Sequence, residues 1–264
     1  LSPAMHNAAY AALGLDRVYL AYRVRPEDLG DAIRAISALG ILGVNLTVPH
    51  KEAAARIIKD LSAEARLLRA VNCIVNRDGA LSGDNTDARG LERDLRALGV
   101  NLRRRLAVVI GAGGAAAAAI LACSRMGAAR IVVTNRTRAR AAALARRFAG
   151  FAAMTARDLD ALTDRALLAD AAIVINATSM GLTTKRFADL EYKATPRGCF
   201  FYDCIYAPKP TAFLVTARRL GRPHADGAGM LANQGELAFE LFNRVAPPRG
   251  VMRRALMERL GRRT

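Results

Sequence analysis

Tryptophan is absent from the sequence, and aromatic residues make up only 5% of its 264 residues. The apolar residues, 52% of the chain, are therefore mostly alanine and aliphatic side chains, which is typical of the cores of α/β enzymes. Few rings are available to stack on bases, although a net charge of +17 raises the question of nucleic-acid binding. Because the basic residues are scattered, we expect a surface that steers anionic small molecules, and no nucleic-acid partner.

Long hydrophobic runs and paired cysteines are also missing. No apolar stretch approaches the roughly 20 residues that a bilayer span needs, so no membrane segment is expected. The chain has four cysteines, with neither the spacing of a zinc site nor the density of a disulfide framework: Cys73, Cys123, Cys199 and Cys204. We therefore expect no metal site, reduced thiols and a cytoplasmic location. The length suffices for two modest domains.

The most informative stretch runs from residue 106 to residue 140. An apolar run over 106–110, a glycine-rich turn, an alanine-rich segment and a second apolar run over 131–134 predict a strand, a turn, a helix and a strand. Free N–H groups and the helix dipole at such a turn favour a pyrophosphate. The residues of the turn are Gly111, Ala112, Gly113, Gly114 and Ala115.

No acidic residue follows the second of these strands, where a site for NAD usually has an Asp or Glu that accepts from the ribose 2′-hydroxyl. The chain has Asn135, Arg136 and Thr137 there, and Arg140 follows one turn later. The guanidiniums of Arg136 and Arg140 suit bidentate pairing with a 2′-phosphate, so the predicted cofactor is NADP(H). The alternative is a glycine turn that only packs a helix on a strand, followed by a solvated basic face; the strand context and the arginines favour the cofactor.

A second polar cluster surrounds segment 43–51. A strand is expected over 44–48, and Pro49 ends it. Lys51 then lies at the start of the next helix, at the same end of the strand as Thr47. Because ligands of open α/β sheets bind outside the carboxyl ends of strands, Thr47 and Lys51 are candidates for contacting a small polar substrate. Asp87 follows the polar run 81–86 and is expected to face Lys51 across a cleft, as an ion pair that holds a catalytic amine.

The remaining pattern predicts further elements. Strands are expected over 19–24, 70–75, 173–175 and 199–203, and helices over 26–39, 141–148 and 211–220. In the helix over 26–39, Leu39 is expected to point inward with Ile33 and Ile36. Ser2 is predicted to cap the first helix, and its hydroxyl is alternatively a ligand contact.

Eight stretches resemble, in order and spacing, the motifs of the shikimate dehydrogenase family, and the similarity covers nearly the whole chain. They are Ser2-Pro3 with His6-Asn7, 45–51, 70–72, 83–87, 111–115, 135–137, 176–179 and 229–234. The resemblance implies an α/β fold of two domains. Residues 1–87 and 228–264 would form an N-terminal α/β substrate domain with a mostly parallel sheet, and residues 88–227 a Rossmann-like NADP-binding domain. The active site would lie in the cleft between them.

The activity that the resemblance implies is the reversible NADP-linked reduction of 3-dehydroshikimate to shikimate, a step of aromatic biosynthesis. Lys51 and Asp87 are then the catalytic pair. The residues that hold the substrate are Ser2, Thr47, Lys51, Asn72, Asp87, Tyr206 and Gln234. Those that hold the cofactor are Gly111, Ala112, Gly113, Gly114, Ala115, Asn135, Arg136, Thr137, Arg140, Thr178, Cys204 and Gly227.

Two departures from the family pattern are visible. Members of the family begin with a further strand and a first substrate serine ahead of the position of Ser2, and they commonly have glycine where this chain has Ala88. The first departure is expected to remove one sheet strand and one substrate contact. The second is expected to leave the function unchanged.

Three alternatives stay open. A quinate or quinate/shikimate dehydrogenase keeps the fold and the Lys/Asp pair but often prefers NAD, which Arg136 and Arg140 argue against. A regulatory paralogue that binds the cofactor without turnover has no need of a proton donor such as Lys51. A basic nucleic-acid binder comes last. Monomer and homodimer are both compatible with the sequence.

Overall fold

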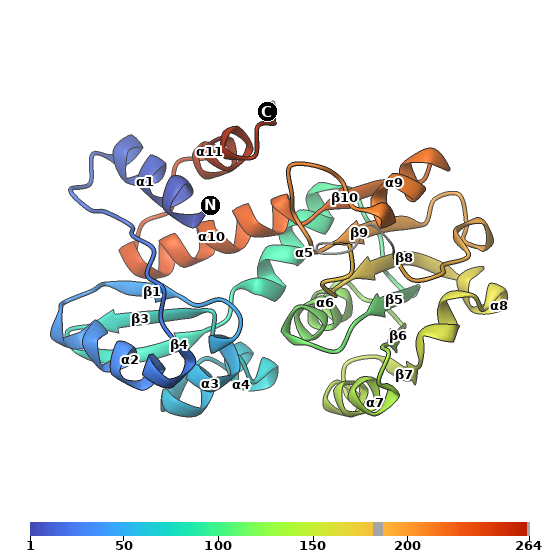
Figure 1. The fold of residues 1–264 in the computed structure, drawn as a ribbon, viewed down its shortest axis with the longest axis horizontal. Coiled ribbons are helices and arrows are strands. Elements are labelled where there is room, and N and C mark those ends of the chain that lie inside the picture. Colours follow the sequence, from blue (N-terminus) through green and yellow to red (C-terminus); the bar gives the residue numbers. More distant parts are fainter. Residues whose placement is uncertain (182–186, 263–264) are drawn as a thin grey trace. The chain divides into compact units, whose positions relative to one another are not determined.

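The computed structural model describes residues 1–181 and 187–262, which form two compact units (Figure 1). The first unit consists of Leu1–Gly90 and Leu231–Thr264, and the second of Leu91–Met230. The chain passes from one unit to the other inside two helices, α5 (Asp87–Ala97) and α10 (Ala228–Asn243). None of the helices within the described residues combines the length and the apolar character that a bilayer span requires.

The first unit combines a four-stranded sheet, in the order β1-β3-β4-β2, with several short helices. Its strands are β1 (Gly43–Asn45), β2 (Asp60–Leu61), β3 (Cys73–Arg77) and β4 (Ala80–Asp84). Its helices, besides parts of α5 and α10, are α1 (Ser2–Leu13), η1 (Pro26–Asp28), α2 (Leu29–Ala38), α3 (His50–Ile57), α4 (Ala63–Leu68) and α11 (Val251–Arg259). Helix α1 packs against α11.

The expectation of a mostly parallel sheet in the first unit is wrong in detail. Strand β3 pairs antiparallel with both β1 and β4, and only β2 and β4 are parallel. The cause is the tight connection between β3 and β4, where Asp78 (φ 53°) and Gly79 (φ 91°) both have positive φ. A two-residue turn with that geometry returns the chain alongside itself, so β3 and β4 can only form an antiparallel hairpin.

Three local predictions are also wrong. Segment 19–24 forms no strand in the described structure; the backbone N–H and C=O of Tyr19 bond instead to the side chain of Asn7, at 2.7 and 3.0 Å. Leu39 is 72% exposed, because α2 ends at Ala38 and the chain turns away at Gly40 (φ 63°). Ser2 does not cap α1, since it is already the first helical residue and Leu1 occupies the N-cap position.

Aliphatic side chains from α2, α3, α4 and β3 fill the core between the sheet and its helices in the first unit. On the other side of β3, Phe242 of α10 packs against Cys73 and Val75. Gly43 allows this close approach, because a Cβ at that position would lie 2.0 Å from the Phe242 ring. Helix α10 is thus fixed firmly against the sheet.

His6 on α1 is fully buried among aromatic rings of the first unit. Its ring stacks on Tyr19 at a centroid distance of 4.2 Å and lies 5.8 Å from Phe239 and 6.1 Å from Phe242. Neither ring nitrogen has a hydrogen-bond partner among the described residues. Burial without a partner disfavours the imidazolium and lowers the pKa of His6 to about 4.

This buried imidazole makes the stability of the first unit depend on pH. The unfolded chain, in which the His6 pKa returns to its ordinary value of about 6.5, binds the proton more readily than the folded chain. The stabilising contribution is therefore complete above about pH 6.5 and falls by about 3 kcal/mol as the pH decreases to about 4. Urea unfolding of the wild-type chain followed by circular dichroism between pH 4 and 7 measures this loss.

The matched comparison is between His6→Phe and His224→Phe. The first variant should flatten the pH dependence, because phenylalanine suits the aromatic surroundings and does not titrate. The second should leave the dependence unchanged, because His224 is exposed. Equal pH dependence in the wild type and in His6→Phe would contradict the assignment.

The second unit contains a fully parallel sheet of six strands in the order β10-β9-β8-β5-β6-β7. The strands are β5 (Leu106–Ile110), β6 (Arg130–Thr134), β7 (Ala153–Arg157), β8 (Ala171–Asn176), β9 (Phe200–Asp203) and β10 (His224–Asp226). The helices are α6 (Gly114–Arg125), α7 (Arg138–Arg147), η2 (Leu159–Leu162), α8 (Arg165–Leu168), η3 (Tyr192–Ala194) and α9 (Ala212–Arg219). The predicted α/β class is thereby confirmed.

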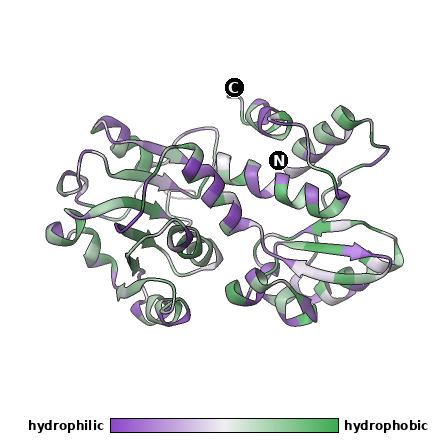
Figure 2. Ribbon diagram, turned by 180° about the vertical axis from the view of Figure 1, so that it is seen from behind, coloured by the Kyte–Doolittle hydropathy of each residue, from purple (hydrophilic) through white to green (hydrophobic). Residues whose placement is uncertain are grey.

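The order of these strands is that of a doubly wound, Rossmann-like sheet: successive strands are added on one side of β5 up to β7 and on the other side from β8 onward. Every residue of β5 and β8 is buried, and the central strands are hydrophobic in Figure 2. This fits the prediction of a continuous apolar strand rather than an alternating one. Ligands of such sheets bind at the carboxyl ends of the strands beside the reversal.

Candidate functional site

An ion pair between Lys51 and Asp87 lies at the centre of the polar cluster in the first unit. Lys51 Nζ is 2.6 Å from Asp87 Oδ2, and the two side chains are 23% and 11% exposed. Lys51 is the second residue of α3 and Asp87 the first of α5, so each stands at the start of a helix. The ammonium therefore stays accessible while its partner is largely withdrawn from water.

Asn72, which precedes β3, organises the groups around this pair. Its side-chain amide donates to Asp87 Oδ1 at 2.8 Å and to Thr86 Oγ1 at 3.0 Å. Its side-chain oxygen accepts from the backbone N–H of Thr86 at 2.9 Å. The two oxygens of the Asp87 carboxylate are thus held separately, Oδ1 by Asn72 and Oδ2 by Lys51, which fixes the plane of the carboxylate.

Gln234 reaches the same cluster from helix α10. Its Oε1 lies 3.4 Å from both Asn72 Nδ2 and Thr86 Oγ1, and its Nε2 donates to the Leu231 carbonyl at 2.9 Å. The approach is possible because α5 presents Gly90, where a Cβ would lie 2.7 Å from Gln234 Cβ and 2.8 Å from its backbone nitrogen. Glycine at position 90 therefore sets how closely Gln234 approaches Asn72.

We expect Gly90→Ala to displace Gln234. The added methyl group cannot be accommodated by a side-chain rotation, because it meets the backbone of α10, so the helices must separate. The expected cost is about 1–3 kcal/mol of stability together with a higher KM for the substrate. Steady-state kinetics and thermal unfolding check both effects. The matched control is Gly30→Ala on α2, where a Cβ meets only the end of the Arg34 side chain, at 3.6 Å. A Gly90→Ala variant as stable and as active as the control would contradict this arrangement.

The glycine turn of the second unit joins β5 to α6. Gly111 has φ 120°, and a Cβ there would lie 2.9 Å from the Ala177 carbonyl oxygen, so only glycine fits. Gly113 is the N-cap of α6 without a side-chain cap, and a Cβ at Gly113 or Gly114 would meet nothing within 4 Å. A twelve-residue helix thus begins at an open, uncapped N-terminus, which suits a phosphate group.

Exposed cationic side chains follow the next strand. Asn135 comes directly after β6, and its side chain donates to the Thr137 carbonyl at 3.0 Å, which shapes the turn into α7. Arg136 and Arg140 are exposed, and Thr137 is the N-cap residue of α7. Because β5 and β6 are adjacent and parallel, these residues and the glycine turn lie at the same edge of the sheet.

Hydrogen bonds join the residues at the ends of β8 and β9, and the segment after β8 lies beside Gly111 of the glycine turn. Asn176 donates to Asp203 Oδ1 at 2.9 Å and accepts from the Thr178 hydroxyl at 2.7 Å. Burial raises the pKa of Asp203 to about 6, against hydrogen bonds from Thr211, from the Ile205 N–H and from Asn176. The Thr178 hydroxyl in turn accepts from the Met180 N–H at 3.0 Å, so it serves the turn that follows β8.

Gly227 and Cys204 approach each other closely in the second unit. A Cβ at Gly227 would lie 2.4 Å from the Cys204 carbonyl oxygen, and the Gly227 N–H donates to the Ile205 carbonyl at 3.1 Å. Cys204 is partly exposed and the other three cysteines are buried; all four lie in the described part of the chain, and none forms a disulfide. In the same part of the chain no cluster of His, Cys, Asp or Glu has the arrangement of a metal site.

Three family models match separate parts of this chain. The shikimate dehydrogenase substrate binding domain matches residues 1–74, shikimate / quinate 5-dehydrogenase matches residues 94–208, and the shikimate 5′-dehydrogenase C-terminal domain matches residues 227–257. A shikimate dehydrogenase (NADP(+)) from Citrifermentans bemidjiense is 41% identical over 98% of this chain and 91% of that protein. The chain belongs to the shikimate dehydrogenase family.

Solved structures of related proteins agree with this placement. Shikimate 5-dehydrogenase from Thermus thermophilus, in complex with NADP(H) and shikimate, has a TM-score of 0.86 and 35% identity, covering 98% of this chain and 94% of that chain. Quinate dehydrogenase from Corynebacterium glutamicum, in complex with NAD, has a TM-score of 0.88 and 30% identity, covering 97% and 94%. The fold alone therefore does not separate shikimate from quinate dehydrogenases.

The residues that the shikimate dehydrogenase family pattern proposes for the substrate are only partly brought together. Lys51, Asn72, Asp87 and Gln234 form the one hydrogen-bonded cluster described above. Thr47 is exposed one turn before Lys51, and its carbonyl accepts from the His50 N–H. Ser2 is half-buried at the start of α1, and Tyr206, 39% exposed, belongs to the second unit.

Two members of the cluster were missed by sequence reasoning. Thr86 and Asn85 lie in the polar run before Asp87, where turn and capping residues are the default interpretation. Both are buried, at 0% and 2% exposure, and both make hydrogen bonds inside the cluster. Their position directly before the predicted catalytic carboxylate was the available signal.

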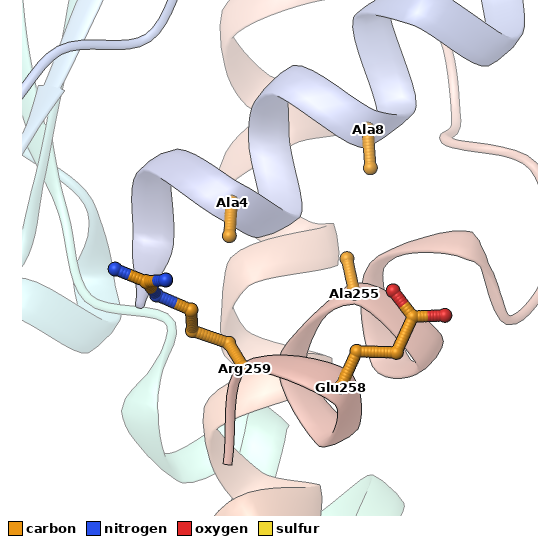
Figure 3. A pocket seen from close by; sticks show the side chains of 5 residues that line it. All are labelled: Ala4, Ala8, Ala255, Glu258 and Arg259. Carbon is orange, nitrogen blue, oxygen red and sulfur yellow. The ribbon is translucent and has the colours of Figure 1, made fainter. Parts of the chain in front are cut away.

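An open groove of about 420 Å³ lies elsewhere on the first unit, between α1 and α11 (Figure 3). Ala4 and Ala8 of α1 face Ala255, Glu258 and Arg259 of α11. None of the residues proposed for the shikimate dehydrogenase site lines it.

Proposed function

We propose that this chain catalyses the reversible NADP-dependent interconversion of 3-dehydroshikimate and shikimate. The observation that carries the proposal is the Lys51–Asp87 ion pair of 2.6 Å, whose carboxylate accepts from the amide of Asn72, with Gln234 at 3.4 Å from that amide. An accessible ammonium beside hydrogen-bonding amides suits a small polyhydroxylated substrate. Residues 1–87 and 228–264 form the proposed substrate domain, and residues 88–227 the proposed NADP domain.

Lys51 is the proposed proton donor and acceptor. In the reducing direction its ammonium gives a proton to the alkoxide that develops as the ketone is reduced, and in the oxidising direction its neutral amine takes the proton from the hydroxyl. Asp87, at 2.6 Å, orients Nζ and offsets its charge. The substrate's hydroxyls and carboxylate are proposed to contact Ser2, Thr47, Asn72 and Gln234, together with Tyr206 of the second unit.

The residues of the second unit fit a bound NADP(H). The uncapped N-terminus of α6, with open space in front of Gly113 and Gly114, suits the pyrophosphate, and the exposed Arg136 and Arg140 suit the 2′-phosphate. When bound, the dinucleotide supplies or takes the hydride. The other residues proposed to line this site are Gly111, Ala112, Ala115, Asn135, Thr137, Thr178, Cys204 and Gly227.

A cytoplasmic location remains a prediction, supported by four cysteines that form no disulfide within the described structure. The oligomeric state also stays a prediction, either monomer or homodimer.

Parallel assays test the proposed activity. NADPH or NADH formation is followed by absorbance with shikimate or quinate as substrate and NADP⁺ or NAD⁺ as cofactor. We expect the highest kcat/KM for shikimate with NADP⁺. A higher value for quinate with NAD⁺ would identify the chain as a quinate dehydrogenase, and cofactor binding without turnover of either substrate would point to a regulatory paralogue.

A further inference from the structure

Asn85 is a fully buried amide that the proposed chemistry does not use. It lies two residues before Asp87, is 2% exposed, and both ends of its side chain bind the backbone. Its Oδ1 accepts from the Asp87 N–H at 3.0 Å, and its Nδ2 donates to the Ala70 carbonyl at 2.9 Å. One side chain thus ties the start of helix α5 to the segment that leads into β3.

The same segment is tied to Lys51. The backbone N–H of Val71 donates to the Lys51 carbonyl at 2.9 Å. A continuous series of three hydrogen bonds therefore connects the two residues of the ion pair through their backbones, from Lys51 to Val71, from Ala70 to Asn85, and from Asn85 to Asp87. Asn85 is the only side chain in this series.

The backbone of Asn85 is itself held in place by the side chain of Asp84. Its backbone N–H donates to Asp84 Oδ1 at 2.7 Å, and Asp84 also receives hydrogen bonds from Ser62 at 2.6 Å and from Arg89 at 2.5 Å. Burial alone would raise the pKa of Asp84, but these donors and the charge of Arg89 outweigh it and hold the pKa below its usual value. The Asp84 carboxylate is therefore held in place by several donors, and it in turn holds the backbone of Asn85.

We propose that Asn85 is a positioning residue that sets the distance between Lys51 and Asp87. The proposal rests on the function proposed above for that pair. Because Asn85 is buried, water does not readily replace its amide, and its loss frees the Asp87 N–H and the Ala70 carbonyl, so that among the described side chains that of Asn72 alone joins this segment to Thr86 and Asp87. Asp87 then moves relative to Lys51, and proton transfer to the substrate becomes slower.

Asn76 supplies a matched control in the same unit. It is also a buried asparagine that binds the backbone at both ends: it accepts from the Gly79 N–H at 2.9 Å and donates to the Ile41 carbonyl at 2.9 Å. Within the described structure, its side-chain hydrogen bonds reach neither Lys51 nor Asp87. Asn76→Ala therefore reproduces the loss of a buried amide without touching the three-bond series.

The kinetic test compares Asn85→Ala, Asn85→Ser and Asn76→Ala. We expect kcat for shikimate oxidation to fall about 10- to 100-fold in Asn85→Ala, with the KM for NADP⁺ unchanged. Asn85→Ser should lose less, because its hydroxyl can still accept from the Asp87 N–H. Asn76→Ala should keep the wild-type kcat at a similarly lowered melting temperature.

A second measurement does not depend on turnover. The Lys51 side chain is only 23% exposed while it is bound to Asp87, so its release should make the amine more accessible and raise the rate at which a small amine-acylating reagent modifies Lys51 by about threefold or more in Asn85→Ala. Peptide mass spectrometry reads the modification relative to the exposed Lys59. The ratio should stay at the wild-type value in Asn76→Ala.

The outcomes separate the two proposals. If the wild type oxidises shikimate but Asn85→Ala matches Asn76→Ala in kcat and in labelling, the positioning role is wrong and the function stands. If the wild type is inactive with shikimate, the proposed function fails, and the labelling ratio alone decides the role of Asn85. Failure of both Asn85 variants to fold, while Asn76→Ala folds, would also overturn the positioning role, because Asn85 would then serve the architecture.

Discussion

Replacing Lys51 with alanine should lower kcat by about 10²–10⁴-fold while NADP⁺ still binds with wild-type affinity. The physical reason is that the alkoxide formed on hydride transfer needs a proton from a positioned donor, and Lys51 Nζ is the ammonium held by Asp87 at 2.6 Å. The cofactor residues proposed above belong to the second unit, so the variant should retain them. Initial rates of NADP⁺ reduction with shikimate and calorimetric titration of NADP⁺ measure the two quantities.

Two further variants distinguish proton transfer from charge alone. Lys51→Arg keeps a cation beside Asp87 but cannot release its proton, so it should be nearly as inactive as Lys51→Ala. Lys59→Ala removes an exposed lysine near the end of α3 and should leave the kinetics unchanged. An active Lys51→Arg variant would show that Lys51 acts only through its charge.

Reversing the charge at Arg136 should change the cofactor preference. A carboxylate there repels the 2′-phosphate and can accept from a ribose 2′-hydroxyl, so Arg136→Asp should lose about 10²–10³-fold in kcat/KM for NADP⁺. The kcat/KM for NAD⁺ should stay the same or rise. Steady-state kinetics with both cofactors at saturating shikimate measure the ratio.

The matched control for this change is Arg146→Asp. Arg146 is exposed in the last turn of α7, the helix that begins two residues after Arg136, so the substitution alters the net charge equally but away from the glycine turn. Its cofactor ratio should stay at the wild-type value. A cofactor ratio that is unchanged in Arg136→Asp, or changed equally in both variants, would contradict the assignment of the phosphate site.

The elements that sequence reasoning predicted well are those whose signals are local. The unit from β5 to β6 follows from an apolar run, a glycine turn and an alanine-rich helix, all contiguous in the chain. The Lys51–Asp87 pair was also predicted, because Lys51 follows an expected strand and Asp87 follows the polar run 81–86. In each case neighbouring residues determine where the side chain lies.

The strand expected over 19–24 failed because strand formation depends on contacts between distant residues. Segment 19–24 has the composition of a strand, but pairing is a non-local property, and Asn7 takes the backbone bonds of Tyr19 instead. The short edge strands β7 and β10 gave no apolar run to detect. Asn85 has the sequence context of a turn residue, and only its bond to the Ala70 carbonyl reveals that it joins two backbones near the ion pair.

Transfer of deuterium tests the proposed chemistry most directly. Shikimate labelled with deuterium on the carbon that carries the oxidised hydroxyl is incubated with NADP⁺ and the wild-type chain, and the NADPH formed is analysed by mass spectrometry. Hydride transfer predicts one deuterium on the nicotinamide ring of each NADPH formed, and the Lys51→Ala control should form scarcely any NADPH. NADPH without deuterium, or no NADPH from a folded chain that binds NADP⁺, would contradict it.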